Sequence, residues 1–180
     1  VTLTNATFPA GHVIQTQYAE LLTNMSTSST NDTSTGLACS ITPTAATNYI
    51  LATFYVEASN ATSTYGTRLN LNVTGGGTDG NVGAGTGGAG TGGSSRASAK
   101  KVITGGPLPN GSHGHHRFSS SVRFRCNDTV PNWSSGALTV TVMVSTNSAS
   151  HAARINWADG ADNTSYSACS SQLILQELKG

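Results

Sequence analysis

The chain has 180 residues and a mass of 18.3 kDa, and only 9% of its residues are charged, with a formal net charge of +1. A typical soluble domain carries about 25% charged residues, so this chain is polar through Ser, Thr, Asn and Gly rather than through ions. The small net charge excludes nucleic-acid binding by phosphate neutralisation, and the composition excludes a coiled coil or helical bundle. No apolar run approaches the roughly 20 residues that span a bilayer.

Apolar and polar residues alternate in a series of short segments, as in half-buried β-strands. In chain order these segments are 11–18, 37–42, 49–56, 68–73, 118–126, 138–144, 153–157 and 173–175. Turn-forming clusters separate them, and the only stretch compatible with a helix, 17–25, is too short to favour one. About eight short strands without helical patterns predict an all-β, antiparallel β-sandwich, with a jelly roll as the favoured topology.

The length suits one hydrophobic core, so we interpret 1–180 as a single β-sandwich domain with an N-terminal lead segment at 1–10. Because the chain begins at Val1 without a signal-peptide pattern, we expect a processed product or a segment of a longer protein. Glycine occupies 11 of the 19 positions in 75–93. A phosphate-binding loop would need a following helix and a well-placed Lys or acid. The pattern lacks both, so we interpret 75–106 as a Gly-rich loop insertion.

The three cysteines, Cys39, Cys126 and Cys169, are too few for a disulfide scaffold, and none forms a CxxC zinc pattern. Two arrangements remain open: three buried thiols, or one disulfide with one free thiol. Cys39 and Cys126 each fall in phase with apolar strand positions, which favours buried thiols.

The acidic residues do not form a recognised catalytic pair, and no G-x-S-x-G elbow occurs to present a nucleophilic serine. Asp159, Asp162 and Asn163 are close in sequence but lack the alternating acids and terminal Glu of a calcium-binding loop, so a polar surface turn is favoured. We therefore expect no enzymatic activity, assign no catalytic residues, and expect no cofactor other than the metal ion considered next.

His113 and His115 lie in a G-x-H-x-H pattern at 111–115. In an extended chain this spacing points both imidazoles to the same side. Three chains around an axis would supply six imidazoles, enough for octahedral coordination of a transition metal. The pattern resembles that of trimeric phage tail-fibre tips that hold iron. A solvated turn is the favoured alternative for this short segment.

Nine of the 14 asparagines stand in N-x-[ST] sequons, the acceptor pattern for N-glycosylation. With Ser and Thr so abundant, chance would produce roughly four, so the excess indicates a glycosylated, exposed surface. The alternative is that Thr- and Asn-rich strands of a bacterial virus create sequons that never meet the glycosylation machinery. The candidate acceptors are Asn5, Asn24, Asn31, Asn60, Asn72, Asn110, Asn127, Asn132 and Asn163.

The order of several motifs resembles a module of virion structural proteins found in marine phages and large algal viruses. These motifs are the opener F-P-A-G-H-V-I-Q at 8–15, a Thr/Ser-rich stretch at 23–35, G-L-A-C-S-I-T-P at 36–43, N-Y-I-L-A at 48–52, and L-I-L-Q-E-L at 173–178. The chain departs from the module in its Gly-rich insertion, in its basic strand at 117–125, and at 48–49, where the module has Lys.

The resemblance implies a structural protein on the virion surface: a tail fibre or knob, a head fibre, or a capsid decoration (cement) protein that acts in assembly, stabilisation and host attachment. It also implies a homotrimer whose partners are its own copies, a capsid or tail protein, and a host-surface glycan. A carbohydrate- or receptor-binding module is the alternative, with Trp133, Trp157, Tyr65 and Tyr166 as candidate stacking residues. A glycosylated cell-surface protein or extracellular filament subunit is a further alternative.

Overall fold

The computed structural model describes residues 9–60, 67–82, 116–146, 149–150, 152–156 and 170–180, and this part of the chain is all-β. Its ten strands are β1 (Val13–Leu21), β2 (Met25–Thr27), β3 (Thr33–Ile41), β4 (Tyr49–Asn60), β5 (Thr67–Thr74), β6 (Gly80–Val82), β7 (His116–Arg125), β8 (Leu138–Thr146), β9 (Ala153–Ile155) and β10 (Ser171–Leu178).

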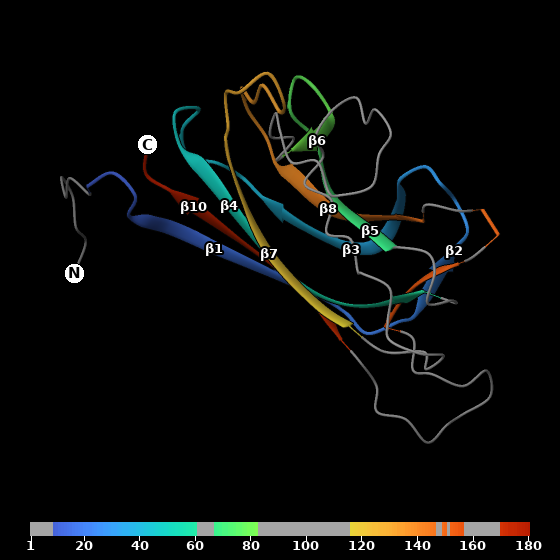
Figure 1. Cartoon of the computed structure of the whole chain (residues 1–180). Helices are drawn as coiled ribbons and strands as arrows, with labels where there is room; N and C mark the ends of the chain where they lie inside the picture. Colours follow the sequence, from blue (N-terminus) through green and yellow to red (C-terminus); the bar gives the residue numbers. More distant parts are fainter. Residues whose placement is uncertain (1–8, 61–66, 83–115, 147–148, 151, 157–169) are drawn as a thin grey trace, which may run out of the picture.

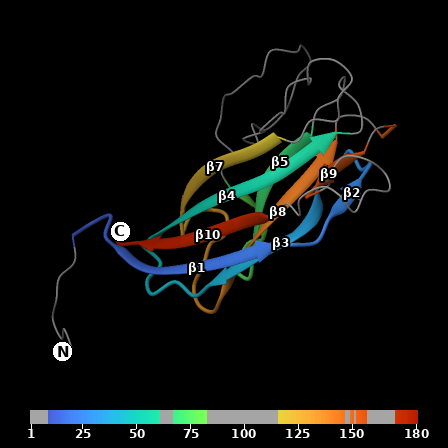
Figure 2. The same ribbon diagram turned by 90° about the horizontal axis from the view of Figure 1, so that it is seen from below.

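The strands form two packed sheets, and every strand pair is antiparallel (Figure 1). In sheet A, β1, β10, β4 and β7 lie side by side (Figure 2). The short strands β2 and β9 extend the same sheet: β10 pairs with β4 up to Tyr55, and β9 pairs with β4 from Ala58 onward. Sheet B has the order β3-β8-β5-β6.

The order of the strands is that of a jelly roll. The chain alternates between the sheets, with β1 and β2 in sheet A, β3 in B, β4 in A, β5 and β6 in B, β7 in A, β8 in B, and β9 and β10 in A. The first long strand thereby pairs with the last, β1 with β10, and β3 pairs with β8. This interleaving is the double Greek key of a jelly roll, so the predicted fold class is confirmed.

The core lies between the sheets, and strand alternation explains which residues fill it. In β10, Leu173 and Leu175 are fully buried while the residues between them are partly exposed. In β8, Val140 and Val142 are likewise buried from the opposite sheet. Because successive strand residues point to opposite faces, the period-two pattern in the sequence predicted these inward positions correctly.

The structure differs from the sequence interpretation in two segments. The stretch 17–25 is not helical: it contains the end of β1 and the start of β2, because pairing with β10 and β9 satisfies its backbone. The interpretation of 75–106 as a loop is corrected at its start, where β6 pairs with β5 and buries Val82. A turn at 75–79 joins them; Gly75 has φ +87° there, and its N–H donates to Asp79 Oδ1 at 3.0 Å.

The cysteine prediction is confirmed for the two residues that the structure describes. Cys39 in β3 and Cys126 after β7 are both free thiols buried in the core. Cys169 lies outside the described residues.

Candidate functional site

The predicted histidine pair, His113 and His115, lies outside the described residues. The pair precedes His116, the first residue of β7, which pairs with Ala58 near the end of β4. Among the described residues, no three His, Cys, Asp or Glu side chains are grouped so that they could hold a metal ion. The metal site therefore stays a prediction.

Five of the predicted sequon asparagines have described side chains. Asn24, Asn31, Asn127 and Asn132 are exposed residues, as glycosylation of an acceptor requires. Asn72 is half-buried in β5, and its Nδ2 donates to Asn81 Oδ1 at 3.3 Å. The side chain of Asn60 and the residues Asn5, Asn110 and Asn163 lie outside the described part. Glycosylation of the four exposed sites stays a prediction.

Of the aromatic residues predicted to stack on sugars, the structure describes Trp133. Its ring is half-buried and packs against the core, and Nε1 donates to Gly136 O at 2.8 Å. A ring held in this way anchors the β7–β8 loop and offers a sugar little surface. Trp157, Tyr65 and Tyr166 lie outside the described residues.

A buried carboxylate, Glu177 of β10, joins three segments at the end of the sandwich where the chain terminates. Gln15 Nε2 donates to its Oε2 at 2.7 Å, while the Thr44 backbone N–H at 2.7 Å, Thr44 Oγ1 at 2.8 Å and Asn48 Nδ2 at 2.6 Å donate to its Oε1. Burial by itself would raise the pKa of Glu177, but these hydrogen bonds outweigh it and hold the pKa below its ordinary value. We name Gln15, Thr44, Asn48 and Glu177 the carboxylate latch.

The carboxylate latch has the character of a structural element. Glu177 is completely inaccessible to solvent, and both of its oxygens already accept hydrogen bonds. A general base needs an oxygen within reach of a substrate proton, and a general acid needs a raised pKa. Glu177 has neither property, so we assign it to folding rather than to chemistry.

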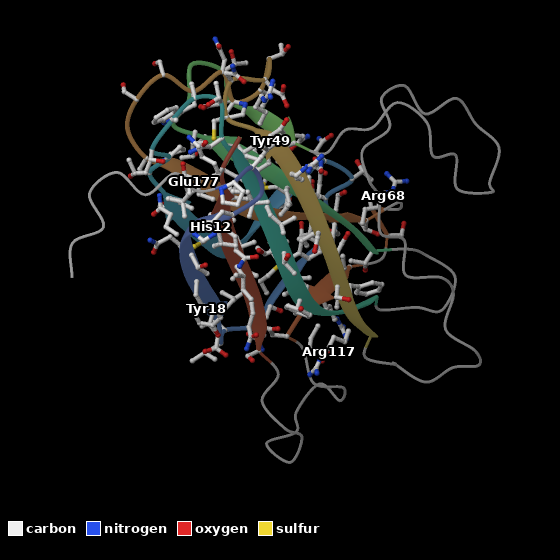
Figure 3. All side chains as sticks on the ribbon, turned by 90° about the vertical axis from the view of Figure 1, so that its left-hand side faces the viewer. His12, Tyr18, Tyr49, Arg68, Arg117 and Glu177 are labelled. Carbon is white, nitrogen blue, oxygen red and sulfur yellow. The ribbon has the colours of Figure 1, made fainter. Side chains whose placement is uncertain are left out.

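The most distinctive surface lies on the outer face of sheet A, along β4 and β7. The exposed positions of β7 carry Arg117, Arg123 and Arg125, which alternate with residues that point inward. In β4, Glu57 pairs with Arg117, Leu51 with Arg123, and Tyr49 with Arg125. Tyr55 lies between Glu57 and Leu51 on the same strand. We name Tyr49, Tyr55, Arg117, Arg123 and Arg125 the arginine–tyrosine surface. In Figure 3, Tyr49 and Arg117 mark its two ends.

Two guanidinium groups are positioned by one ring. Arg123 Cζ lies 4.9 Å and Arg125 Cζ 5.0 Å from the centroid of the Tyr49 ring, within cation–π range. At the other end, Arg117 Nε donates to Glu57 Oε1 at 2.8 Å, and this arginine stays largely exposed while Glu57 is nearly buried. The pair Arg123 and Arg125 therefore carries positive charge that Glu57 does not neutralise.

Sequence reasoning identified 117–125 as a basic strand but did not single out its arginines as a site, and it missed Tyr18 and Tyr55. Tyr18 is 54% and Tyr55 40% exposed on the outer face of sheet A. The available signal was the common phase of the three arginines in one strand. The pairing of β4 with β7, which places Tyr49 beside Arg125, depends on two segments far apart in sequence.

Neither protein-family models nor curated protein sequences match this chain. Within the described residues, no helix is long and apolar enough to cross a membrane.

Proposed function

We propose that the chain is a structural protein of the virion surface, a fibre, knob or capsid decoration protein that acts in assembly and stabilisation as a homotrimer. The observation that carries this proposal is the interleaved jelly-roll order of β1, β10, β4 and β7 against β3, β8, β5 and β6. Viral capsid and lectin domains are built on this architecture. The outer faces of its two sheets are surfaces on which copies or partners could pack.

The positions of the motifs that resemble virion modules also support the proposal. Gln15 belongs to the opener, Thr44 directly follows the G-L-A-C-S-I-T-P motif at 36–43, and Glu177 belongs to the closing motif. All three meet in the carboxylate latch, and Gln15 Nε2 also donates to Thr42 O at 2.7 Å. Motif residues that bind one another across the sheet have a structural role, as expected of a protein whose task is assembly.

Two measurements test the proposal. The mass in solution, determined by light scattering, is expected to be three times the chain mass of 18.3 kDa. Antibodies raised against the isolated protein are expected to label intact virus particles in electron micrographs. A monomer at high concentration would contradict the trimer, and unlabelled particles whose proteins lack this sequence by mass spectrometry would contradict the virion role.

A carbohydrate- or receptor-binding module is the second candidate, and the exposure of Tyr18 and Tyr55 favours it. Aromatic faces on a rigid sheet are available for contact with sugar rings. Replacing both residues by Ser is expected to abolish binding on a glycan array if this function is correct. The Trp133→Phe variant serves as the control, because that ring packs against the core.

The third candidate is a glycosylated cell-surface protein or extracellular filament subunit, and the four exposed sequons favour it. Treatment of protein from its natural source with an N-glycosidase would lower the intact mass by kilodaltons if the sequons carry glycans. An unchanged mass would remove this alternative. Metal analysis of the same material, with about one transition-metal ion per three chains expected, tests the site predicted at His113 and His115.

A further inference from the structure

One strand carries a third of the basic residues of this chain. Three of its nine basic residues, Arg117, Arg123 and Arg125, share the exposed face of β7. Strand geometry separates Arg123 from Arg125 by about 7 Å and Arg117 from Arg125 by about 27 Å. Between them the same face carries the hydroxyls of Ser119 and Ser121. The result is an extended row of arginines and hydroxyls along β7.

The arginines at the Tyr49 end are held in place but not neutralised. Both guanidinium groups rest at the Tyr49 ring, which reduces the conformational entropy they lose on binding. In the described part of the chain, neither side chain forms an ion pair with a carboxylate. The carboxylates in the neighbourhood are Glu57, which pairs with Arg117, and Asp128, whose Oδ2 accepts from the Arg125 backbone N–H at 3.1 Å.

The neighbouring strand β4 adds an aromatic ring and a hydroxyl beside the arginines of β7. Tyr55 in β4 stands opposite Ser119 and is 40% exposed, while Thr53 and Ser121 share a hydrogen bond of 2.8 Å between their hydroxyls. A guanidinium binds sulfate or carboxylate groups through two parallel N–H donors, whereas hydroxyls and aromatic faces suit the rings between those groups.

We propose that the arginine–tyrosine surface binds an acidic polysaccharide, with Arg123 and Arg125 holding a sulfate or carboxylate group and Arg117 a second one further along the same chain. Nucleic acid is a poorer match, because the net charge is only +1 and phosphate neutralisation usually involves a larger basic surface. This site is independent of the virion role: a cell-surface protein could use it equally.

Binding is tested by titrating the intact protein with dextran sulfate, with hyaluronate and with neutral dextran in isothermal calorimetry. We expect dextran sulfate or hyaluronate to bind and neutral dextran not to bind. The two acidic polymers separate sulfate from carboxylate recognition. Arg123→Ser with Arg125→Ser is expected to weaken the affinity about tenfold or more, since it removes charge-assisted hydrogen bonds. Arg123→Lys with Arg125→Lys is expected to weaken the affinity by a smaller factor, because an ammonium keeps the charge but lacks the two parallel N–H donors of a guanidinium.

The control is Arg68→Ser, which removes one positive charge from β5 in the opposite sheet and is compared with Arg123→Ser alone. The affinity of the Arg68 variant is expected to stay within about twofold, because salt screens a charge that lies in the opposite sheet. Circular dichroism and thermal melting verify that each variant is folded. Three results would each overturn the proposal: no binding of either acidic polymer by the wild type, equal loss in the control, or equally tight binding of double-stranded DNA.

Discussion

At the scale of single residues, Glu177 shows how a buried charge is stabilised in a chain with few charges. Its carboxylate accepts hydrogen bonds from two amide side chains, a hydroxyl and a backbone N–H supplied by two other segments. Asn48 is itself held from both sides, since its Oδ1 accepts from the Gly180 N–H at 3.0 Å. A buried carboxylate without these donors would be strongly unfavourable.

Glu177→Gln is expected to lower the free energy of unfolding by about 2 kcal/mol, because an NH2 group would face donors and the charge-assisted bonds would be lost. Urea denaturation measures the change. The control is Glu20→Gln, at an exposed position of β1, which is expected to change the free energy by less than about 0.5 kcal/mol.

The lowered pKa of Glu177 also predicts a pH dependence. Because the folded state holds the pKa below its ordinary value of 4.5, ionised Glu177 stabilises the fold above that pH. This contribution is lost as the pH falls through the folded-state pKa. The stability difference between wild type and Glu177→Gln should therefore shrink from about pH 7 towards about pH 2. A difference that stays constant over this range would contradict the assignment.

The buried thiols give a second prediction at this scale. Burial, together with the charges of Glu177 and Asp128, raises the pKa of Cys126 to about 12, and burial also raises that of Cys39. Since the thiolate is the reactive form, both residues are expected to resist iodoacetamide at about pH 8 in a folded Cys169→Ser variant and to react in urea. Rapid labelling of either thiol in the folded protein would be the contrary result.

At the scale of elements, Asn156 connects strands that the sheet order brings together. Its Nδ2 donates to Leu21 O at 2.7 Å and to Thr23 O at 3.2 Å, and its Oδ1 accepts from Ser171 Oγ at 2.6 Å. Its backbone N–H donates to Glu57 O at 2.9 Å. One residue directly after β9 thus connects β1, β4 and β10. It lies where the pairing of β4 with β10 ends and its pairing with β9 begins.

Asn156→Ala is expected to lower the free energy of unfolding by about 3 kcal/mol, since it removes these side-chain bonds and leaves Ala in a left-handed conformation. Asn132→Ala is the matched control: Asn132 has φ 50° against 52° for Asn156, but it is exposed. This variant is expected to lower the free energy of unfolding by only about 1 kcal/mol, the cost of placing Ala in a left-handed conformation. Equal losses in chemical denaturation would show that the bonds of Asn156 contribute nothing.

At the scale of the whole molecule, both sheets share one core. Leu175 from sheet A and Val142 from sheet B are completely buried within the same cluster. The chain crosses between the sheets repeatedly, so neither sheet consists of a continuous stretch of sequence. We therefore expect the two sheets to unfold together.

Leu175→Ala is expected to destabilise the protein by about 3 kcal/mol through lost burial and a residual cavity. It should lower the midpoint of a single thermal transition seen by both far-UV circular dichroism and tryptophan fluorescence. Leu22→Ala, at a position that is 70% exposed, is the control and should change the free energy by less than about 0.5 kcal/mol. Two separate transitions in the Leu175 variant would contradict a shared core.

The positions of most strands along the chain and their inward faces were predictable from the sequence because alternation is a local property. In segments such as 138–144 and 49–56, the alternation of apolar and polar residues indicates the buried positions even when the neighbouring strand is not known. The short strands β2 and β6 were not predicted, because three residues are too few for a period and, unlike β9, neither lies in a longer alternating segment; their pairing with β9 and β5 defines them.

What the sequence by itself determined is therefore the all-β class, the core faces, and the buried state of Cys39 and Cys126. Only the tertiary structure decided that Gln15, Thr44 and Glu177 form one latch, and that Tyr49 positions Arg123 and Arg125. The physical reason is distance along the chain. Burial follows from a residue's own strand, whereas these sites depend on which strands pair and in which register.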